Sequence, residues 1–264
     1  ARGAVSAVSY TARDGTSIPA YLTLPAGKTP EDGPFPLVLM PHCGPEARDT
    51  AAYDWWAQVY AVEGYLVLQP NFRGSAGYGP QIRDAGFGEF GGKMVEDVID
   101  GAAFLEAEGL AKPGGVCIAG ASYGGYSALM APLLDSDRVK CSVAVNPVSD
   151  IFSHMGRFQR ETSAYNYWAR YAGGTADQAP DSKRASTPAE RLSEYQSPIL
   201  IIHGREDTTV DVDQSQRFQR DWGDRAGLTY IELDGEDHYL TGTASRQRVL
   251  AESIAFPSAN HPAR

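Results

Sequence analysis

Three residues in the second half of the chain are of the types that hydrolyse ester and amide bonds: Ser122, Asp207 and His238. A serine hydroxyl is a poor nucleophile at neutral pH, so it needs a base within hydrogen-bond reach and an acid that orients this base. Ser122 lies in the stretch Gly-Ala-Ser-Tyr-Gly-Gly (120–125), directly after the apolar run 115–119. Such glycines let a strand turn sharply into a helix and lift the serine above the sheet edge. The motif also arises by chance, so its place between a predicted strand and a predicted helix carries the prediction that Ser122 is the nucleophile.

The base and the acid are predicted from their places after strands. His238 is the predicted base, because it follows the polar turn 234–237 at the end of an apolar strand and precedes the last helix. Asp207 is the predicted acid, because it lies just past the carboxyl end of a strand, where ligands meet open α/β sheets. Glu206 competes for this role, and His203, inside an apolar strand, is expected to be structural. The order Ser, Asp, His is that of α/β-hydrolases and differs from the orders in trypsin-like and subtilisin-like enzymes.

Two backbone N–H groups are predicted to form an oxyanion hole. Acyl transfer places negative charge on the substrate carbonyl oxygen, and preorganised N–H donors stabilise that charge. Tyr123, directly after the nucleophile, is predicted to offer its N–H at the start of a helix. The second donor is predicted in the loop 42–45, where Gly44 has no side chain to block its amide.

Apolar runs and helical periodicity alternate along the chain. Strands are predicted at residues 5–10, 18–24, 37–40, 65–69, 116–119, 139–145, 198–203 and 228–233. Helices are predicted at residues 54–63, 93–108, 126–134, 212–222 and 245–255. This alternation predicts the α/β-hydrolase fold, in one domain over residues 1–264, with a mostly parallel, eight-stranded sheet and helices on both faces.

Two of the helices have predicted inner faces. Helix 54–63 is expected to bury one face made of Trp55, Val59 and Val62. Helix 93–108 is expected to bury Val95, Val98, Ala102 and Leu105. Its acidic side chains are expected to lie largely outward: Glu96, Asp97, Asp100, Glu106 and Glu108.

One long interruption, residues 149–197, separates the predicted strands 139–145 and 198–203. It is rich in Phe, Tyr and Trp and too long for a bare crossover. Because it leaves its strand above the catalytic edge, this insert is expected to combine substrate contacts with internal packing.

The composition limits the classes of partner. The chain has 264 residues, of which 42% are hydrophobic and 21% charged, as in ordinary globular proteins. Its net charge of −10 disfavours nucleic acid and anionic membranes as partners. No apolar run approaches the length of a membrane span. No signal peptide opens the chain, which begins without methionine and is expected to be trimmed or a fragment.

Neither a metal nor a cofactor is predicted. The three cysteines, Cys43, Cys117 and Cys141, show no metal-site spacing, and an odd number cannot all pair. Cys117 and Cys141 fall in apolar strands and are predicted to be buried free thiols, which favours a reducing compartment such as the cytoplasm. The glycines of 86–91 match a dinucleotide-binding spacing, but no strand runs into them, so this segment is predicted to be a flexible loop.

In these motifs the chain resembles the catalytic domain of the prolyl oligopeptidase family, especially its acylaminoacyl-peptidase and dipeptidyl-peptidase branch. The most specific matching run is Asn-Phe-Arg-Gly-Ser-Ala-Gly-Tyr-Gly, because plain esterases seldom carry it. The other matches span nearly the whole chain in order: residues 13–15, 18–21, 42–45, 120–125, 203–204 with Asp207 and Val210, and 237–238.

The resemblance implies a serine peptidase that cleaves short peptides through an acyl-enzyme. It implies the triad Ser122, Asp207 and His238, with Tyr123 and Gly44 as oxyanion donors. By family position it also implies an apolar pocket for the residue before the scissile bond, with Tyr123 and these lining residues: Val148, Ile151, Phe158 and Val210.

Two departures from the family pattern leave other functions open. Cys43 stands where the family usually has glycine, which puts the backbone of this loop in doubt. Members usually carry an N-terminal β-propeller, and no propeller repeats precede residue 1. The chain is therefore expected to form a homodimer or to belong to a longer parent with a propeller. A carboxylesterase acting on small esters with the same triad is the main alternative, and a catalytically silent binding domain is a third.

Overall fold

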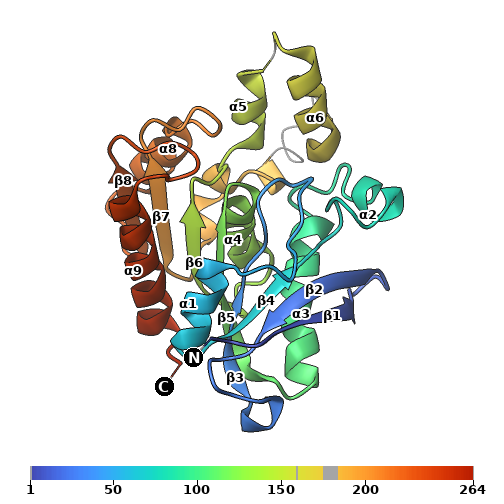
Figure 1. The fold of residues 1–264 in the computed structure, drawn as a ribbon. Coiled ribbons are helices and arrows are strands. Elements are labelled where there is room, and N and C mark those ends of the chain that lie inside the picture. Colours follow the sequence, from blue (N-terminus) through green and yellow to red (C-terminus); the bar gives the residue numbers. More distant parts are fainter. Residues whose placement is uncertain (1, 159, 175–183, 264) are drawn as a thin grey trace.

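The computed structural model describes residues 2–158, 160–174 and 184–263, and its centre is an eight-stranded sheet (Figure 1). The strand order is β1-β2-β4-β3-β5-β6-β7-β8. β1 and β2 are antiparallel to their neighbours, and the other strands pair in parallel. The strands are β1 (Val5–Thr11), β2 (Ser17–Thr23), β3 (Phe35–Leu39), β4 (Leu66–Pro70), β5 (Ala111–Ala121), β6 (Val139–Val145), β7 (Ile199–Gly204) and β8 (Leu228–Leu233).

Helices cover both faces of this sheet, each over its own hydrophobic core. One core packs α1 and α9 against the sheet, and the other packs α3, α4 and α8 against the opposite face and includes residues of α5 and α6. The helices are α1 (Trp55–Val62), α2 (Pro80–Asp84), α3 (Lys93–Ala107), α4 (Tyr123–Leu134), α5 (Ile151–Gly156), α6 (Thr162–Ala172), α8 (Asp213–Trp222) and α9 (Thr243–Asn260). Short 3₁₀ helices are η1 (Pro30–Asp32), η2 (Pro188–Glu190) and η3 (Leu192–Glu194).

The predicted mostly parallel, eight-stranded sheet is confirmed, with boundaries within a few residues for most elements. The parallel strands β3 to β8 all end at one edge of the sheet, from which loops lead to the covering helices. The predicted insert begins with α5 and α6, which project above this edge in Figure 1. Side chains from several loops therefore converge at the carboxyl ends of the central strands.

The predicted inner face of α1 is wrong. Trp55 and Val62 are exposed, whereas Trp56 and Tyr60 are buried against the sheet. Asp54 caps the helix by accepting hydrogen bonds from the backbone N–H groups of Trp56 and Ala57, at 2.8 and 2.9 Å. Apolar residues occur on both sides of this helix, so periodicity could not tell which side the sheet would cover.

The prediction for α3 is right for its apolar residues and wrong for Asp97. Val95, Val98, Ala102 and Leu105 are buried as expected, but Asp97 is buried too. Its carboxylate accepts from the Arg73 guanidinium at 2.7 Å, and Arg73 also binds Asp14 at 2.9 Å. Burial raises the pKa of Asp97, against the opposing effect of Arg73. A buried charge with a hydrogen-bonded partner is tolerated in a core, and helical periodicity does not reveal that partner.

The prediction of free thiols at Cys117 and Cys141 is also wrong. The two residues are directly opposite one another on β5 and β6 and form a disulfide, with Cα atoms 4.7 Å apart. Cys43 is a free, exposed thiol. The inference of a reducing compartment from buried thiols is therefore unsupported.

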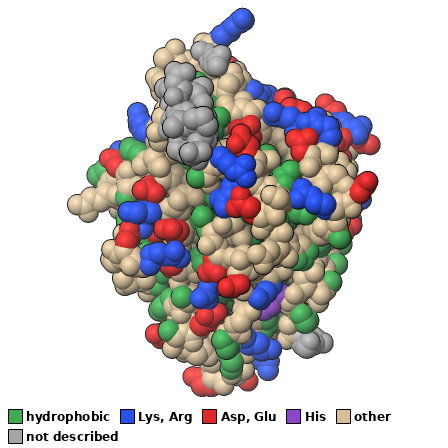
Figure 2. Space-filling model, turned by 180° about the vertical axis from the view of Figure 1, so that it is seen from behind, with side chains coloured by type: hydrophobic (Ala, Val, Ile, Leu, Met, Phe, Trp, Pro, Cys, Tyr) green, Lys and Arg blue, Asp and Glu red, His purple; other side chains and the backbone are tan. Residues whose placement is uncertain are grey.

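The surface shows no strong segregation of charge on the side opposite the view of Figure 1. Figure 2 shows acidic and basic side chains interspersed over this face. Within the described parts of the chain, no helix has both the length and the apolar character needed to cross a bilayer.

Candidate active site

Ser122 lies at the strained turn where β5 ends and α4 begins. Its backbone has φ 57° and ψ −115°, a conformation that costs a non-glycine residue about 1–3 kcal/mol. Its N–H donates to the carbonyl of Val145 on the neighbouring strand at 2.9 Å, and its own carbonyl accepts from the N–H of Tyr126 at 2.9 Å. These bonds hold the serine at the edge of the sheet.

The glycines around Ser122 are required by close packing. A Cβ atom on Gly120 would lie 2.6 Å from the carbonyl carbon of Gly124. A Cβ atom on Gly124 would collide with the carbonyl oxygen of Pro41. Any side chain at either position would push the turn away from its neighbours. The same contacts bring the loop after β3 beside the serine.

Asp207 and His238 are brought together although they follow different strands. The His238 Nδ1 atom donates to Asp207 Oδ2 at 2.6 Å, while Asp207 Oδ1 accepts from the N–H groups of Thr209 and Val210, both at 2.8 Å. Because a carboxylate only accepts, the proton of neutral His238 lies on Nδ1 and leaves Nε2 free as a base. The competing acid Glu206 is exposed.

The surroundings of Asp207 stabilise its charged form. Burial alone raises the pKa of this carboxyl, but hydrogen bonds from His203 and His238 outweigh burial and hold the pKa well below its usual range. His203 is fully buried, with its ring nitrogens on Ser215 Oγ at 2.7 Å and on the Val210 carbonyl at 2.9 Å. His203 therefore has the structural role that was expected of it.

Ser122 and His238 both remain accessible at this edge. Ser122 keeps 7% of its surface and the His238 side chain 12%, enough for a small reacting group to reach them. Among the described residues, Ser122 Oγ has no hydrogen-bond partner. Nucleophile–base hydrogen bonds are commonly long before substrate binds, so this geometry is compatible with a resting site.

The two predicted oxyanion donors are supplied by segments that lie side by side. The N–H of Tyr123 is at the first position of α4, where a helix has no internal acceptor for it. Gly44 has φ 130°, and a hollow of about 160 Å³ is lined by both its neighbour Cys43 and Gly120 of the serine turn. Cys43, the departure from the family pattern, is exposed and lines this hollow.

A second Ser–His pair, Ser75 and His42, is structural. His42 Nδ1 donates to the carbonyl of Cys43 at 2.7 Å, so Nε2 accepts from Ser75 Oγ at 2.8 Å. His42 also stacks on Phe72 at 4.3 Å, and burial lowers its pKa to about 4. Ser75 has no exposed surface, so a substrate cannot reach it, and the pair anchors the loop that carries Gly44.

Asn146 is a site residue that the sequence analysis missed. It follows β6 with φ 44°, its Nδ2 donates to the His238 carbonyl at 3.0 Å, and its Oδ1 accepts from the N–H of Gly204 at 2.9 Å. It thus ties the loop of the base to the end of β7. An asparagine directly after a buried strand tolerates positive φ, and this was the one available signal.

Three of the residues predicted to line a substrate pocket lie in the same hydrophobic core as Tyr123. Val148, Ile151 and Val210 are at most 1% exposed and belong to one hydrophobic cluster with Tyr123. Phe158 is half-buried. Their role in binding stays a prediction.

His154 on α5 was not recognised as part of this region. It is fully buried, and neither ring nitrogen has a hydrogen-bond partner among the described residues. The ring contacts Phe158 and Trp168 edge-on, at 5.3 and 4.8 Å between centroids. Burial, with a smaller contribution from Arg157, lowers the pKa of His154 to about 4. Asp207 raises this pKa and His238 lowers it, both by smaller amounts. The imidazole is therefore neutral at physiological pH.

Replacing His154 by phenylalanine is expected to reduce the loss of stability in mild acid. Between about pH 6.5 and 4 the unfolded chain takes up a proton at His154 that the folded chain does not, so the free energy of unfolding falls as pH falls, by about 2 kcal/mol down to pH 5. His154→Phe removes this term, and Phe152→Leu on the same helix is the matched control. Urea unfolding at about pH 7.5 and about pH 5 measures it. If the free energy of unfolding of His154→Phe falls between these two pH values as much as that of the unsubstituted protein, the low pKa of His154 is contradicted.

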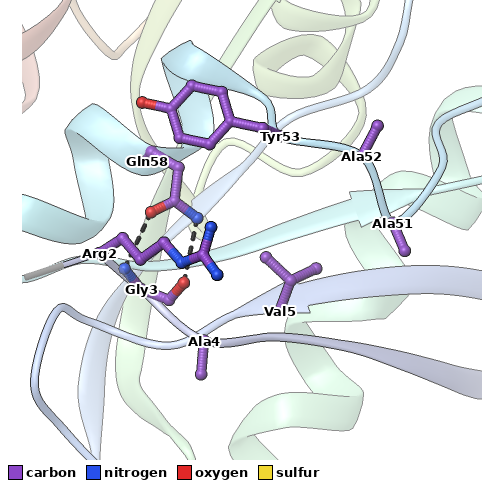
Figure 3. A pocket seen from close by; sticks show the side chains of 8 residues that line it. All are labelled: Arg2, Gly3, Ala4, Val5, Ala51, Ala52, Tyr53 and Gln58. Atoms are coloured by element: carbon purple, nitrogen blue, oxygen red, sulfur yellow. Dashed lines mark hydrogen bonds between the residues drawn. The ribbon is translucent and has the colours of Figure 1, made fainter.

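A further hollow on the described surface lies away from these residues. It has a volume of about 430 Å³ and lies between the N-terminal segment and the loop before α1 (Figure 3). Gln58 closes its floor, accepting from the Gly3 N–H at 2.9 Å and donating to the Gly3 carbonyl at 3.1 Å. None of its lining residues is one of the predicted catalytic groups. Within the described chain, no cluster of three or more His, Cys, Asp or Glu side chains is arranged to hold a metal.

Comparison with known proteins identifies the family of this chain. A model of the prolyl oligopeptidase family matches residues 51–260. Dipeptidyl aminopeptidase BIII of Pseudoxanthomonas mexicana is 32% identical over 247 residues, which cover 88% of this chain and 35% of that protein. The chain thus spans about a third of the length of the curated relatives it matches.

Solved structures show the same fold. A puromycin-hydrolyzing peptidase of Mycobacterium tuberculosis has a TM-score of 0.87 and 26% identity, covering 98% of this chain and 39% of that one. An acylaminoacyl peptidase of Pyrococcus horikoshii has a TM-score of 0.83 over 98% of this chain and 42% of that one, at 21% identity, and shows likeness in fold alone. Together with the sheet topology, these similarities confirm the predicted α/β-hydrolase fold.

Proposed function

The chain belongs to the prolyl oligopeptidase family, and from this premise we propose that it is the catalytic unit of a serine peptidase that cleaves short peptides. The observation that carries the proposal is the 2.6 Å hydrogen bond from His238 to Asp207 at the same sheet edge as the strained Ser122. The similarity to a dipeptidyl aminopeptidase suggests that the bond cleaved lies near the amino end of the substrate.

In the proposed mechanism, His238 Nε2 removes the proton of Ser122 Oγ as this oxygen attacks the substrate carbonyl carbon. The resulting oxyanion accepts hydrogen bonds from the N–H groups of Tyr123 and Gly44. The scissile C–N bond then breaks, and the leaving nitrogen receives the proton from His238. Water, activated by the same histidine, releases the acyl group from Ser122. Asp207 holds the imidazole in the Nδ1–H tautomer throughout and stabilises it when charged.

The residue before the scissile bond is proposed to be apolar. Val148, Ile151 and Val210 belong to the same hydrophobic cluster as Tyr123, and the predicted lining residue Phe158 is half-buried. A carboxylate or ammonium placed among such side chains would lose hydration without gaining a partner. Substrates with Leu or Phe at this position are expected to exceed those with Asp or Lys by on the order of 100-fold in kcat/KM. A series of peptides that differ only at this residue measures the preference, and faster cleavage after Asp or Lys would contradict it.

Fluorophosphonate labelling followed by peptide mapping tests the proposed chemistry directly. The adduct is expected on Ser122, and preincubation with a short apolar peptide is expected to slow its formation. Absence of any adduct would favour a silent binding domain, and an adduct on another serine would reassign the nucleophile. Peptides and matched small esters in the same assay distinguish a peptidase from a carboxylesterase.

A second subunit or a propeller in a longer parent chain also stays a proposal. It is supported by the exposed aromatic side chains of Trp55 and Tyr239, which line one hollow, because clustered apolar surface often marks an interface. Sedimentation across a dilution series separates a dimer from a monomer. Nothing in the proposed chemistry requires a nucleic acid or a membrane.

A further inference from the structure

A hollow of about 200 Å³ opens beside His238, between the start of α1 and the start of α9. Its wall is mostly apolar and includes Trp55, Trp56, Tyr239 and Val249. Trp55 stacks on Trp56 at 5.9 Å between ring centroids, which fixes a flat aromatic surface on the α1 side. The hollow therefore combines an aromatic wall with one of the proposed catalytic groups.

The residue before the nucleophile leaves this space open. Ala121 lines the hollow beside His238 and also lines the smaller hollow under the Cys43 loop, and Trp56 lies between the two. Gly120 and Ala121 belong to the turn that carries Ser122, so a substrate bound in these hollows would lie next to this turn.

An unpaired cation also lines this hollow. Arg246 on α9 donates from Nε to the carbonyl of Leu240 at 2.8 Å, which orients its guanidinium. No carboxylate of the described chain lies within 4.0 Å of this guanidinium, whereas the nearby Arg248 pairs with Glu252 at 4.0 Å. Arg246 is thus free to receive an anionic group at the mouth of the hollow.

We propose that this hollow binds the leaving group, and that the preferred leaving group is a single aromatic or large aliphatic amino acid with a free carboxylate. The inference rests on the proposed function. His238 must deliver a proton to the leaving nitrogen, so this nitrogen lies within hydrogen-bond reach of the imidazole. From there the side chain of the leaving residue packs on Trp55 and Tyr239, and its carboxylate binds Arg246.

Tripeptides with one constant acyl part test the leaving-group preference. Ala-Leu-Phe is expected to exceed Ala-Leu-Gly by about tenfold to hundredfold in kcat/KM, because its phenyl ring is removed from water when it packs against the aromatic wall. Ala-Leu-Phe amide is expected to fall about threefold to tenfold below the free acid, because its leaving group has no carboxylate for Arg246. Since kcat/KM covers all steps through release of the first product, it reports the leaving group directly.

Variants with matched controls assign the preference to the hollow. Trp55→Ala is expected to reduce the Phe-to-Gly ratio by about tenfold, and Arg246→Ala is expected to abolish the advantage of the free acid. Tyr53→Ala and Arg248→Ala remove exposed residues of the same types outside this hollow and are expected to keep both ratios. Trp55 and Tyr239 are 42% and 72% exposed, so Tyr239→Ala tests the same wall if Trp55→Ala does not fold.

The outcomes separate this inference from the function on which it rests. Hydrolysis of Ala-Leu methyl ester releases methanol, which has no side chain or carboxylate to bind in the hollow. This reaction therefore measures the activity of the triad independently of the hollow. If the ester is cleaved and the three tripeptide substrates have equal kcat/KM values, the leaving-group site is refuted and the proposed function stands. The same conclusion follows if Trp55→Ala, Tyr239→Ala and Arg246→Ala all keep both the Phe-to-Gly ratio and the acid-to-amide ratio. If neither ester nor peptide is cleaved and Ser122 is not labelled, the proposed function fails and this inference fails with it.

Discussion

Replacing Ser122 by alanine is expected to lower kcat for a short apolar peptide by about 10⁶, the scale on which serine peptidases lose activity without their nucleophile. The substitution removes the hydroxyl that the structure holds in a strained turn at the end of β5, at φ 57°. The residual rate would come from binding and from the N–H donors of Tyr123 and Gly44. Single-turnover and steady-state assays with the same peptide measure the loss.

Ser75→Ala is the matched control for this prediction. Ser75 already bonds to a histidine, but it is fully buried and serves to anchor the loop of His42. It is expected to keep fluorophosphonate labelling at Ser122, while Ser122→Ala loses labelling altogether. Labelling that survives in Ser122→Ala and disappears in Ser75→Ala would exchange the two roles.

Asp207→Asn is expected to lower kcat by about 10⁴ with little change in KM, because the imidazole is held in the wrong tautomer. An asparagine keeps an oxygen for the N–H groups of Thr209 and Val210 and turns its NH₂ towards His238. His238 Nδ1 then has to accept, so the proton moves to Nε2 and the base is lost. Kinetics at several pH values measure the effect.

Glu206→Gln is the control for the acid, because Glu206 is the adjacent carboxylate and is exposed. It is expected to change kcat by less than about threefold, as surface substitutions away from a site usually do. A severe loss in Glu206→Gln together with a mild loss in Asp207→Asn would reassign the acid to Glu206.

Local sequence was sufficient to predict most elements and the residues at their ends. The turn at Ser122 is the clearest case. There an apolar strand is followed by small residues and then by a helix, and this succession leaves few backbone conformations free of collision. Asp207 and His238 were predicted from their places in the loops that follow β7 and β8. Parallel strands end at one edge, so residues after strands were expected to meet there.

Periodicity did not decide which surface of α1 the sheet covers. Trp55 and Trp56 are neighbours in sequence and both aromatic, but only Trp56 is buried. Both sides of the helix carry apolar residues, so the choice depends on how the helix is placed against β4 and α9. That placement left Trp55 exposed and created the wall of the hollow beside His238.

Contacts between residues far apart in sequence were decided by the tertiary structure alone. Arg73 joins Asp97, 24 residues away, and Asp14, 59 residues away, and Asn146 reaches the His238 carbonyl across 92 positions. The Cys117–Cys141 disulfide needs the exact register of β5 and β6. Steric preferences act over a few residues and therefore determine strands, turns and helices from sequence, whereas ion pairs, bridges and hollows depend on chain topology and register, which local residue types do not encode.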